Sequence, residues 1–209
     1  MIRKIAIAAL LLSASSAHAH EVWVERDGAG PARIYLGEPG EALPEGGDPQ
    51  FDNLKTPRLV PESAAVQVRK TGYIEVQVPA GDVRVQDDNV FAPWGPEGKK
   101  EGVVYFARAG RAEARAALPF EIVPTTPGGN RFSLMRDGKA IPGASITIVS
   151  PDKWSKTIKT DASGALALPI REKGRYLLSA SAKDEGNFFA RDGMIGILHR
   201  ITTTTFVVN

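Results

Sequence analysis

Histidine is the residue type with the clearest chemical potential in this chain, which contains three histidines and no cysteine. Without cysteine the chain cannot form a disulfide framework, a thiolate metal site or a cysteine nucleophile. The histidines are His18, His20 and His199. Two of them are almost adjacent and the third lies near the other end of the chain, so a shared site requires the fold to bring distant segments together.

The first nineteen residues decide which histidines are available. Met1–Lys4 is a short basic segment, residues 5–14 are apolar, and residues 17–19 (Ala-His-Ala) fit the small-x-small pattern of a cleavage site. The apolar run is too short and wrongly flanked for a stable membrane span. We therefore predict that residues 1–19 are a cleaved secretory signal peptide of bacterial type, which places the product in the periplasm or outside the cell.

Cleavage after Ala19 makes His20 the first residue and gives it two nitrogen ligands. A free α-amine, with a pKa of about 8, then stands beside the imidazole of the same residue, and the two can close a chelate ring on a divalent metal ion. With His18 removed, the only second imidazole is that of His199. An all-nitrogen set favours copper, with nickel and zinc behind it. We predict one divalent copper or nickel ion per chain, with His20 and His199 as ligands.

Each histidine also has a purely structural interpretation. Histidine can follow such a cleavage site for processing reasons alone, and N-termini often fray. His199 comes after residues 195–198 (Ile-Gly-Ile-Leu), which suits a half-buried position on a strand. The two interpretations differ in whether the fold brings His20 near His199.

A carboxylate beside the imidazoles would hold them in place. The candidates are Glu21, Asp87, Asp88 and Asp192. Strand alternation turns Glu21 away from His20, and for each candidate we favour a solvated carboxylate without a metal role. Trp94 lies in a turn-rich segment and is expected to pack over that loop.

The elements that must position these residues are β-strands. Apolar and polar residues alternate in short runs, as in half-buried strands, and 21 glycines and 15 prolines separate them as turns. The sequence contains no pattern of a long amphipathic helix, and only a brief helical turn is expected, near residues 62–65. The predicted strands cover residues 66–69, 74–78, 83–86, 103–107, 131–136, 144–149, 154–160, 165–168, 175–182 and 195–208. In the last of these, Thr202–Thr205 suits a closing strand because β-branched residues fit a pleated surface.

The predicted fold class is all-β, with two β-sandwich domains in tandem after the signal peptide. Three prolines and two glycines fall between Pro119 and Asn130, and we place the domain boundary there. Residues 20–119 then form an N-terminal β domain. Residues 120–209 form an immunoglobulin- or transthyretin-like sandwich, because several short strands at regular spacing without helices are typical of that architecture.

Charge and composition exclude several classes of partner. The hydrophobic fraction of 43% and the charged fraction of 24% are those of a globular protein. Removing Arg3 and Lys4 from the 26 basic residues leaves 24, equal to the 24 acidic residues. A neutral mature chain without a basic stripe has no electrostatic footprint for nucleic acid. No later apolar run reaches the ~20 residues of a transmembrane helix.

Six short motifs stand out along the mature chain. They are His20–Glu25 (HEVWVE), Phe120–Pro124, Asp137–Ala144, Thr160–Gly164, Gly174–Leu178 and His199–Thr202. Together they resemble a family of secreted bacterial proteins linked to the periplasmic NikM-type component of nickel transport systems. The later motifs also occur in transthyretin-like and carboxypeptidase-regulatory-like sandwiches. The resemblance implies a periplasmic metal-binding protein for nickel or copper uptake, delivery or sequestration, with a membrane metal-transport complex as partner.

Two features depart from that family, and no enzyme motif appears. Ile141 replaces the usual leucine, and the scarcity of histidine argues against storage of many ions. His20-Glu21 does not continue into a His-Glu-x-x-His motif, and neither a Gly-x-Ser-x-Gly elbow nor a phosphate-binding loop occurs. We therefore expect a metal carrier and not an enzyme. A copper-dependent oxidative enzyme of histidine-brace type and a metal-free carbohydrate-binding or adhesion module are the alternatives.

Overall fold

The computed structural model describes residues 20–209, which form β-strands and a single 3-10 turn, η1 (Phe51–Asn53). This confirms the all-β prediction. The predicted signal peptide, residues 1–19, lies outside the described residues. Within residues 20–209, no helix has the length and apolar character to span a membrane.

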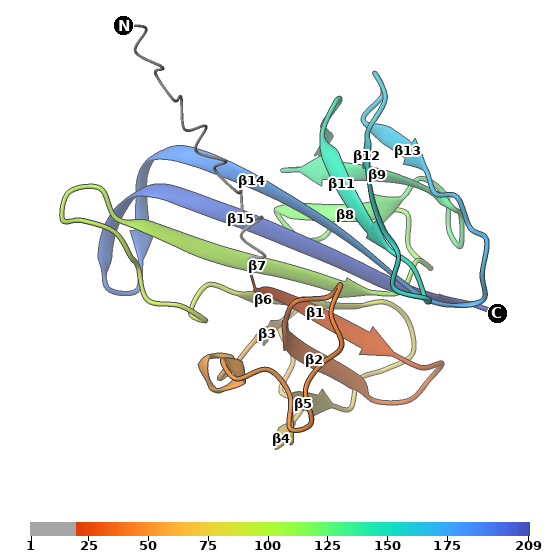
Figure 1. The fold of residues 1–209 in the computed structure, drawn as a ribbon, viewed down its shortest axis with the longest axis horizontal. Coiled ribbons are helices and arrows are strands. Elements are labelled where there is room, and N and C mark those ends of the chain that lie inside the picture. The colour runs from red at the N-terminus through yellow and green to blue at the C-terminus, as the bar shows by residue number, and fades with distance from the viewer. Residues whose placement is uncertain (1–19) are drawn as a thin grey trace, which may run out of the picture.

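The strands form three sheets (Figure 1). The first sheet has the order β1 (Glu21–Arg26), β2 (Ala32–Gly37), β5 (Tyr73–Val76), β4 (Gln67–Lys70). The second, central sheet has seven strands in the order β12 (Ser155–Lys159), β11 (Ser145–Val149), β14 (Gly174–Ala190), β15 (Gly193–Val208), β7 (Glu101–Ala109), β6 (Val83–Asp87), β3 (Arg58–Leu59). The third contains β10 (Lys139–Ala140), β9 (Arg131–Arg136) and β13 (Ala165–Ala167), with β8 (Phe120–Pro124) also paired to β9.

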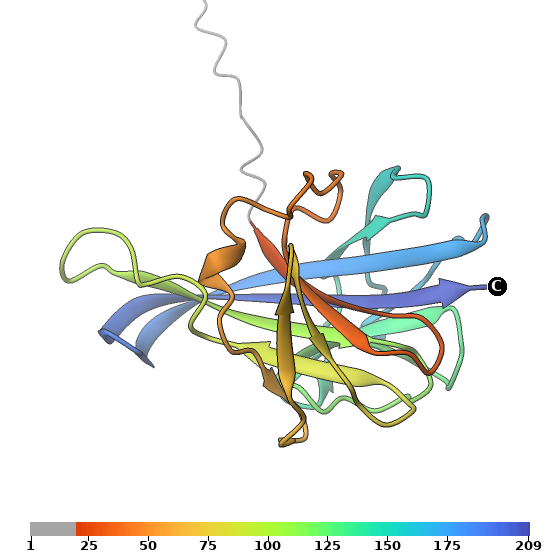
Figure 2. The ribbon, with the colours of Figure 1, turned by 90° about the horizontal axis from the view of Figure 1, so that it is seen from below.

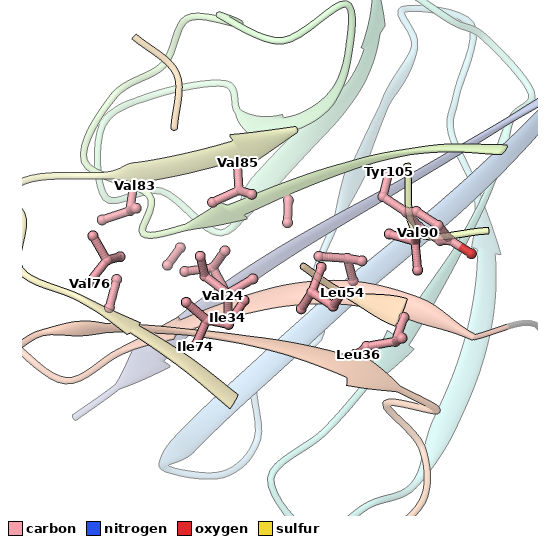
Figure 3. Close-up of a cluster of buried hydrophobic side chains, with 14 of the residues drawn as sticks. Val24, Ile34, Leu36, Leu54, Ile74, Val76, Val83, Val85, Val90 and Tyr105 are labelled. Atoms are coloured by element: carbon pink, nitrogen blue, oxygen red, sulfur yellow. The ribbon is translucent and has the colours of Figure 1, made fainter. Parts of the chain in front are cut away.

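The central sheet lies between the two smaller sheets, because its alternating side chains enter two separate cores. On β7, Val103 and Tyr105 pack with the first sheet, whereas Val104 and Phe106 pack with the third. Figures 1 and 2 show the small sheets on opposite sides of the long central strands. Figure 3 shows the first core, in which side chains of β1, β2 and β5 meet those of β6 and β7.

The two halves of the chain share the central sheet. Residues 20–119 supply β3, β6 and β7, and residues 120–209 supply β11, β12, β14 and β15. The junction is the parallel pairing of β15 with β7, where His199 lies opposite Val103. The expected boundary falls between β7 and β8, and the division into two sandwich domains stays a prediction.

Three local expectations need correction. The helical turn expected near residues 62–65 is irregular, and the 3-10 turn lies at Phe51–Asn53 instead. The strands expected at 175–182 and 195–208 extend into one long hairpin, β14–β15. The segment of the expected domain boundary, residues 119–130, contains the buried strand β8, which is absent from the predicted strands. Of its three prolines, Pro119 precedes the strand, Pro124 is its last residue and Pro127 lies in the turn that follows, positions where a missing N–H is tolerated.

The threonine run has a different role from that of a closing strand. Thr202–Thr205 are fully buried in β15, near the middle of the central sheet. The Thr203 and Thr205 hydroxyls donate to β1 carbonyls on one face, and the Thr204 hydroxyl donates to the Ile122 carbonyl on the other, at 2.7 Å. β15 therefore ties both outer layers to the central sheet.

Candidate functional site

His20 lies directly before β1, and β1 is anchored along both of its edges. One edge pairs with β2 in register from Glu21 opposite Gly37 onward. The other edge faces β15, where the Val22 carbonyl accepts a hydrogen bond of 2.8 Å from Thr203. The segment that follows His20 is therefore held against the middle of the molecule.

Asp48 holds the His20 imidazole. The His20 Nε2 lies 3.1 Å from the Asp48 Oδ1, and the side chains are only 22% and 10% exposed. The Phe91 ring meets the imidazole edge-on, with 6.2 Å between ring centroids. Because Nε2 is paired with the carboxylate, the nitrogen left for a ligand is Nδ1. That nitrogen is nearer the main chain and is the one that can chelate together with the α-amine.

The loop around Asp48 is fixed by a close backbone contact. Gly47 and Gly72 both have positive φ, and a Cβ on Gly47 would lie 2.2 Å from the Gly72 Cα. The Asp48 Oδ1 also accepts a hydrogen bond of 2.7 Å from the Gln50 amide, just before η1. The carboxylate that meets His20 is thus set by the loop and does not swing freely.

A second carboxylate holds His199. On β15 the His199 Nε2 lies 2.6 Å from Oε2 of Glu101, the first residue of β7. This hydrogen bond is the main cause that lowers the pKa of the Glu101 carboxyl. The Trp94 ring stacks on the imidazole at 5.6 Å between centroids, and Trp94 also exchanges two main-chain hydrogen bonds with Glu101. Trp94 therefore packs on His199 and not merely over its own loop.

Two observations place the histidines on the same side of the central sheet. The Val22 and Val24 carbonyls of β1 accept hydrogen bonds from Thr203 and Thr205 of β15, so β1 lies over the face of β15 that carries these side chains. His199 belongs to the same face, because alternate residues of a strand point to one side.

A single short segment also touches both rings. Phe91 contacts His20, and Trp94, three residues later, stacks on His199. The fold therefore brings the two segments together, although each imidazole pairs with its own carboxylate.

Side chains alone do not complete a metal site. Among residues 20–209, no group of three or more histidine, aspartate or glutamate side chains is arranged to hold a metal ion. A third donor would have to be the α-amine of His20, which exists only after cleavage of the chain before this residue.

The carboxylates named from the sequence take other partners. As strand alternation predicts, Glu21 points away from His20, and its Oε1 accepts a hydrogen bond of 2.7 Å from Ser179. Asp87 is buried and accepts from the Asn89 amide, Asp88 pairs with Arg58, and Asp192 lies exposed at the tip of the β14–β15 hairpin.

Sequence reasoning missed Asp48 and Glu101. Asp48 lies in a proline- and glycine-rich stretch without periodicity, where no pattern signals a partner. Glu101 begins β7 just ahead of the run predicted as a strand, at 103–107. The alternation of Glu101 with Val103 was a usable signal, because it puts both on one face of the strand.

Burial shifts the pKa of two groups near β1, the Glu21 carboxyl and the Tyr105 phenol. Desolvation raises the pKa of the Glu21 carboxyl to about 7, and the hydrogen bond from Ser179 opposes this only in part. Burial, with the nearby charges of Glu21 and Asp87, also raises the pKa of the Tyr105 phenol well above its usual range. The surroundings of His20 are therefore poorly solvated on the Glu21 side.

Comparison with known proteins finds no matching family model, no match among curated proteins and no match among solved structures. The resemblance to proteins of nickel transport systems therefore stays a prediction from the motifs.

Proposed function

We propose that this protein is a secreted, periplasmic metal-binding protein that holds one divalent copper or nickel ion at its processed amino terminus. The α-amine and Nδ1 of His20 would chelate the ion, and His199 would add a third nitrogen. The protein would serve metal uptake, delivery or sequestration, with a membrane metal-transport complex as its partner. The finer architecture proposed with it is two β-sandwich domains, residues 20–119 and 120–209, behind a signal peptide of residues 1–19.

The observation that carries this proposal is the pairing of each imidazole with its own carboxylate. Metal-bound histidines usually donate their second N–H to a carboxylate, which fixes the ring and raises its basicity. His20 with Asp48 at 3.1 Å and His199 with Glu101 at 2.6 Å both have this arrangement. In each pair Nε2 is used and Nδ1 is left for a ligand.

The choice of metal follows from the donors. Amine and imidazole nitrogens bind the late first-row divalent ions, with copper ahead of nickel and zinc. The chain supplies no thiolate, because it contains no cysteine. Copper(II) and nickel(II) are therefore the ions to test.

Isothermal titration of correctly processed protein with Cu(II) and Ni(II) tests the proposal. The matched control is the same chain with one alanine added before His20, which keeps the imidazole, Asp48 and the fold but moves the free amine. We expect one ion per chain and an affinity at least tenfold weaker in the extended variant. Equal affinity in the two chains would show that the amine has no part and would overturn the proposed site.

Replacing His199 tests the third nitrogen separately. In His199→Ala, the affinity for Cu(II) should fall while binding to the His20 chelate persists. An unchanged affinity would remove His199 from the ligand set.

A further inference from the structure

A groove lies beside β1, on the side away from His20. It covers the surface of β11 and β14 and has a volume of about 610 Å³. The loop at residues 38–41 forms part of its rim. The groove continues into a second hollow of about 350 Å³ beside Trp23 and Arg175. The two hollows share Pro39, Val149, Lys153 and Leu177, so they adjoin one another along β14.

One end of this groove carries an unsatisfied carboxylate. Glu21 uses Oε1 for the hydrogen bond from Ser179, whereas its Oε2 is buried without a hydrogen-bond partner in the described chain. Glu38 and Glu41 line the same hollow, and Lys153 is the one cation that lines it. A buried acceptor left unpaired costs free energy, which a donor on a ligand would recover. This end is suited to an ammonium group.

The other end carries an unsatisfied guanidinium nitrogen. The Arg175 side chain pairs with Glu25 and Asp27, but its Nη1 is buried and has no hydrogen-bond partner within the described residues. Lys153 lines this hollow too, and its charge adds to that of Arg175, which already pairs with the carboxylates of Glu25 and Asp27. This end is suited to a carboxylate, for which a guanidinium is a strong donor.

The distance between the two ends defines the size of the ligand. Glu21 is fixed to Ser179, and Arg175 lies four residues away on the same strand, β14. At about 3.3 Å per residue the two anchors are about 13 Å apart. An extended chain of about four residues spans this length.

The floor between the anchors suits a peptide. Val149 and Leu177, each 7% exposed and packed in one cluster with Trp23, offer a limited apolar surface, and hydroxyl groups flank them. The hydroxyl-bearing residues are Ser145, Thr147, Ser155, Thr157, Ser179 and Ser181. Hydroxyls both donate and accept, so they can meet the amide N–H and C=O groups of an extended chain.

We propose that this groove binds a short extended peptide, with the free amino group at Glu21 and the terminal carboxylate at Arg175 and Lys153. The unpaired acceptor of Glu21 at one end and the unpaired donor of Arg175 at the other favour such a dipolar ligand over a neutral glycan. Trp23, the aromatic residue that lines the groove, is buried and offers no open face for a sugar ring. The site uses neither histidine and is independent of the proposed metal centre.

The test uses metal-free mature protein in the presence of a chelator, with tetraalanine as the probe. Two-dimensional ¹⁵N–¹H NMR spectra follow the amides of β11 and β14 during titration. We expect saturable shifts at Leu177 and Ser179, and roughly tenfold weaker binding for N-acetyl tetraalanine and for tetraalanine amide, because each lacks one terminal charge. Equal affinity for the free and blocked peptides, or no shift at these amides with millimolar tetraalanine, would overturn the proposal.

Matched variants assign the two ends. Glu21→Gln should weaken free tetraalanine roughly tenfold and leave the acetylated peptide unchanged, whereas Glu45→Gln, outside the groove, should change neither. Lys153→Gln should weaken the peptide acid but not the amide, with Lys156→Gln on the same edge of the sheet as control. Shifts produced by cello-oligosaccharides and not by peptides would assign the groove to a glycan and refute the proposal.

The alanine-extended chain separates this proposal from the metal centre. It should bind tetraalanine normally even though its metal affinity falls. If the mature protein binds metal but not tetraalanine, only the peptide-binding proposal is refuted.

Discussion

Two sets of ion pairs in this protein differ in how many of their polar atoms are already hydrogen-bonded. One is the cluster around Glu121, and the other is the pair of histidine–carboxylate contacts. At the junction of β6, β7 and β8, Arg108 and Glu121 are wholly buried, and Arg84 is nearly so. The Glu121 Oε1 accepts from Arg84 at 2.7 Å and from Arg108 at 3.0 Å, and its Oε2 accepts two main-chain amides, at 2.6 and 2.9 Å. Both carboxylate oxygens are thus fully used, and the cluster has no place for a ligand.

The histidine–carboxylate pairs are open in comparison. The side chains of His20 and His199 are 22% and 31% exposed, and each binds its carboxylate through one ring nitrogen. The closed cluster holds the 110–119 connection to the central sheet, whereas the open pairs orient rings that keep a nitrogen for a ligand. We therefore expect that mutations in the Glu121 cluster lower the stability of the fold. Mutations in the histidine–carboxylate pairs should instead lower the affinity for metal.

The largest effect is expected at Glu121. Glu121→Ala leaves the buried guanidinium groups of Arg84 and Arg108 without their shared carboxylate, and should lower the free energy of unfolding by about 3–5 kcal/mol. Urea denaturation measures this, with the exposed Glu97→Ala as control, expected within about 0.5 kcal/mol of the parent. A loss below about 1 kcal/mol would show that the closed cluster is not a stabilising unit.

The next effect depends on pH. The pKa of Glu21 is raised from 4.5 to about 7, so the folded state binds this proton more tightly than the unfolded state does. The stability gained from Glu21 is complete below pH ~4.5 and is lost as pH rises to ~7, a change of at most about 3 kcal/mol. Denaturation of metal-free protein across this range should show the loss, and Glu21→Gln should abolish it. A parallel pH profile for the variant would contradict the raised pKa.

A smaller effect is expected at the threonines that anchor β1. Thr203→Val removes the hydrogen bond to the Val22 carbonyl and should cost about 2 kcal/mol. It should also speed hydrogen exchange in β1 and weaken metal binding at His20. Thr204→Val is the matched control, because its hydroxyl donates to Ile122 on the opposite face. It should cost similar stability but leave β1 exchange and metal affinity unchanged. Identical hydrogen exchange of the β1 amides in both variants would show that the Thr203 hydrogen bond does not hold β1 in place.

The smallest effect on stability is expected for substitutions of Asp48 and Glu101, the carboxylates paired with the imidazoles. These substitutions should nevertheless weaken metal binding. Asp48→Asn and Glu101→Gln keep the shape of each partner but remove its charge, and should lower metal affinity by roughly 10- to 100-fold. Asp88→Asn, which alters only an exposed pair with Arg58, is the control in the same titration. Unchanged affinity in Asp48→Asn and Glu101→Gln would mean that these carboxylates do not position ligands.

The local part of the fold could be predicted from the sequence, and its long-range part could not. Alternation located most strands, including the one that carries His199, because the side-chain period of a strand is visible in a short window. The parallel pairing of β15 with β7 joins residues about a hundred positions apart, such as His199 and Val103, and no local pattern records it. The buried threonines look like an ordinary β-branched run in the sequence, yet the hydroxyls of Thr203, Thr204 and Thr205 join the three layers.

The residues of the candidate site can also be divided into those that the sequence predicts and those that depend on long-range contacts. His20 and His199 could be named from residue type alone, since few histidines occur. Asp48 could not, because its place depends on the contact of Gly47 with Gly72. The unpaired atoms of Glu21 and Arg175 likewise become apparent only once β1 lies across β14.

The proposed metal ion joins the trimmed amino terminus to the imidazole of His199. Electron spin-echo envelope modulation of the Cu(II)-loaded mature protein counts the imidazoles bound to the metal. We expect two bound imidazoles in the parent protein and one in His199→Ala. Identical modulation in the two proteins would contradict this expectation.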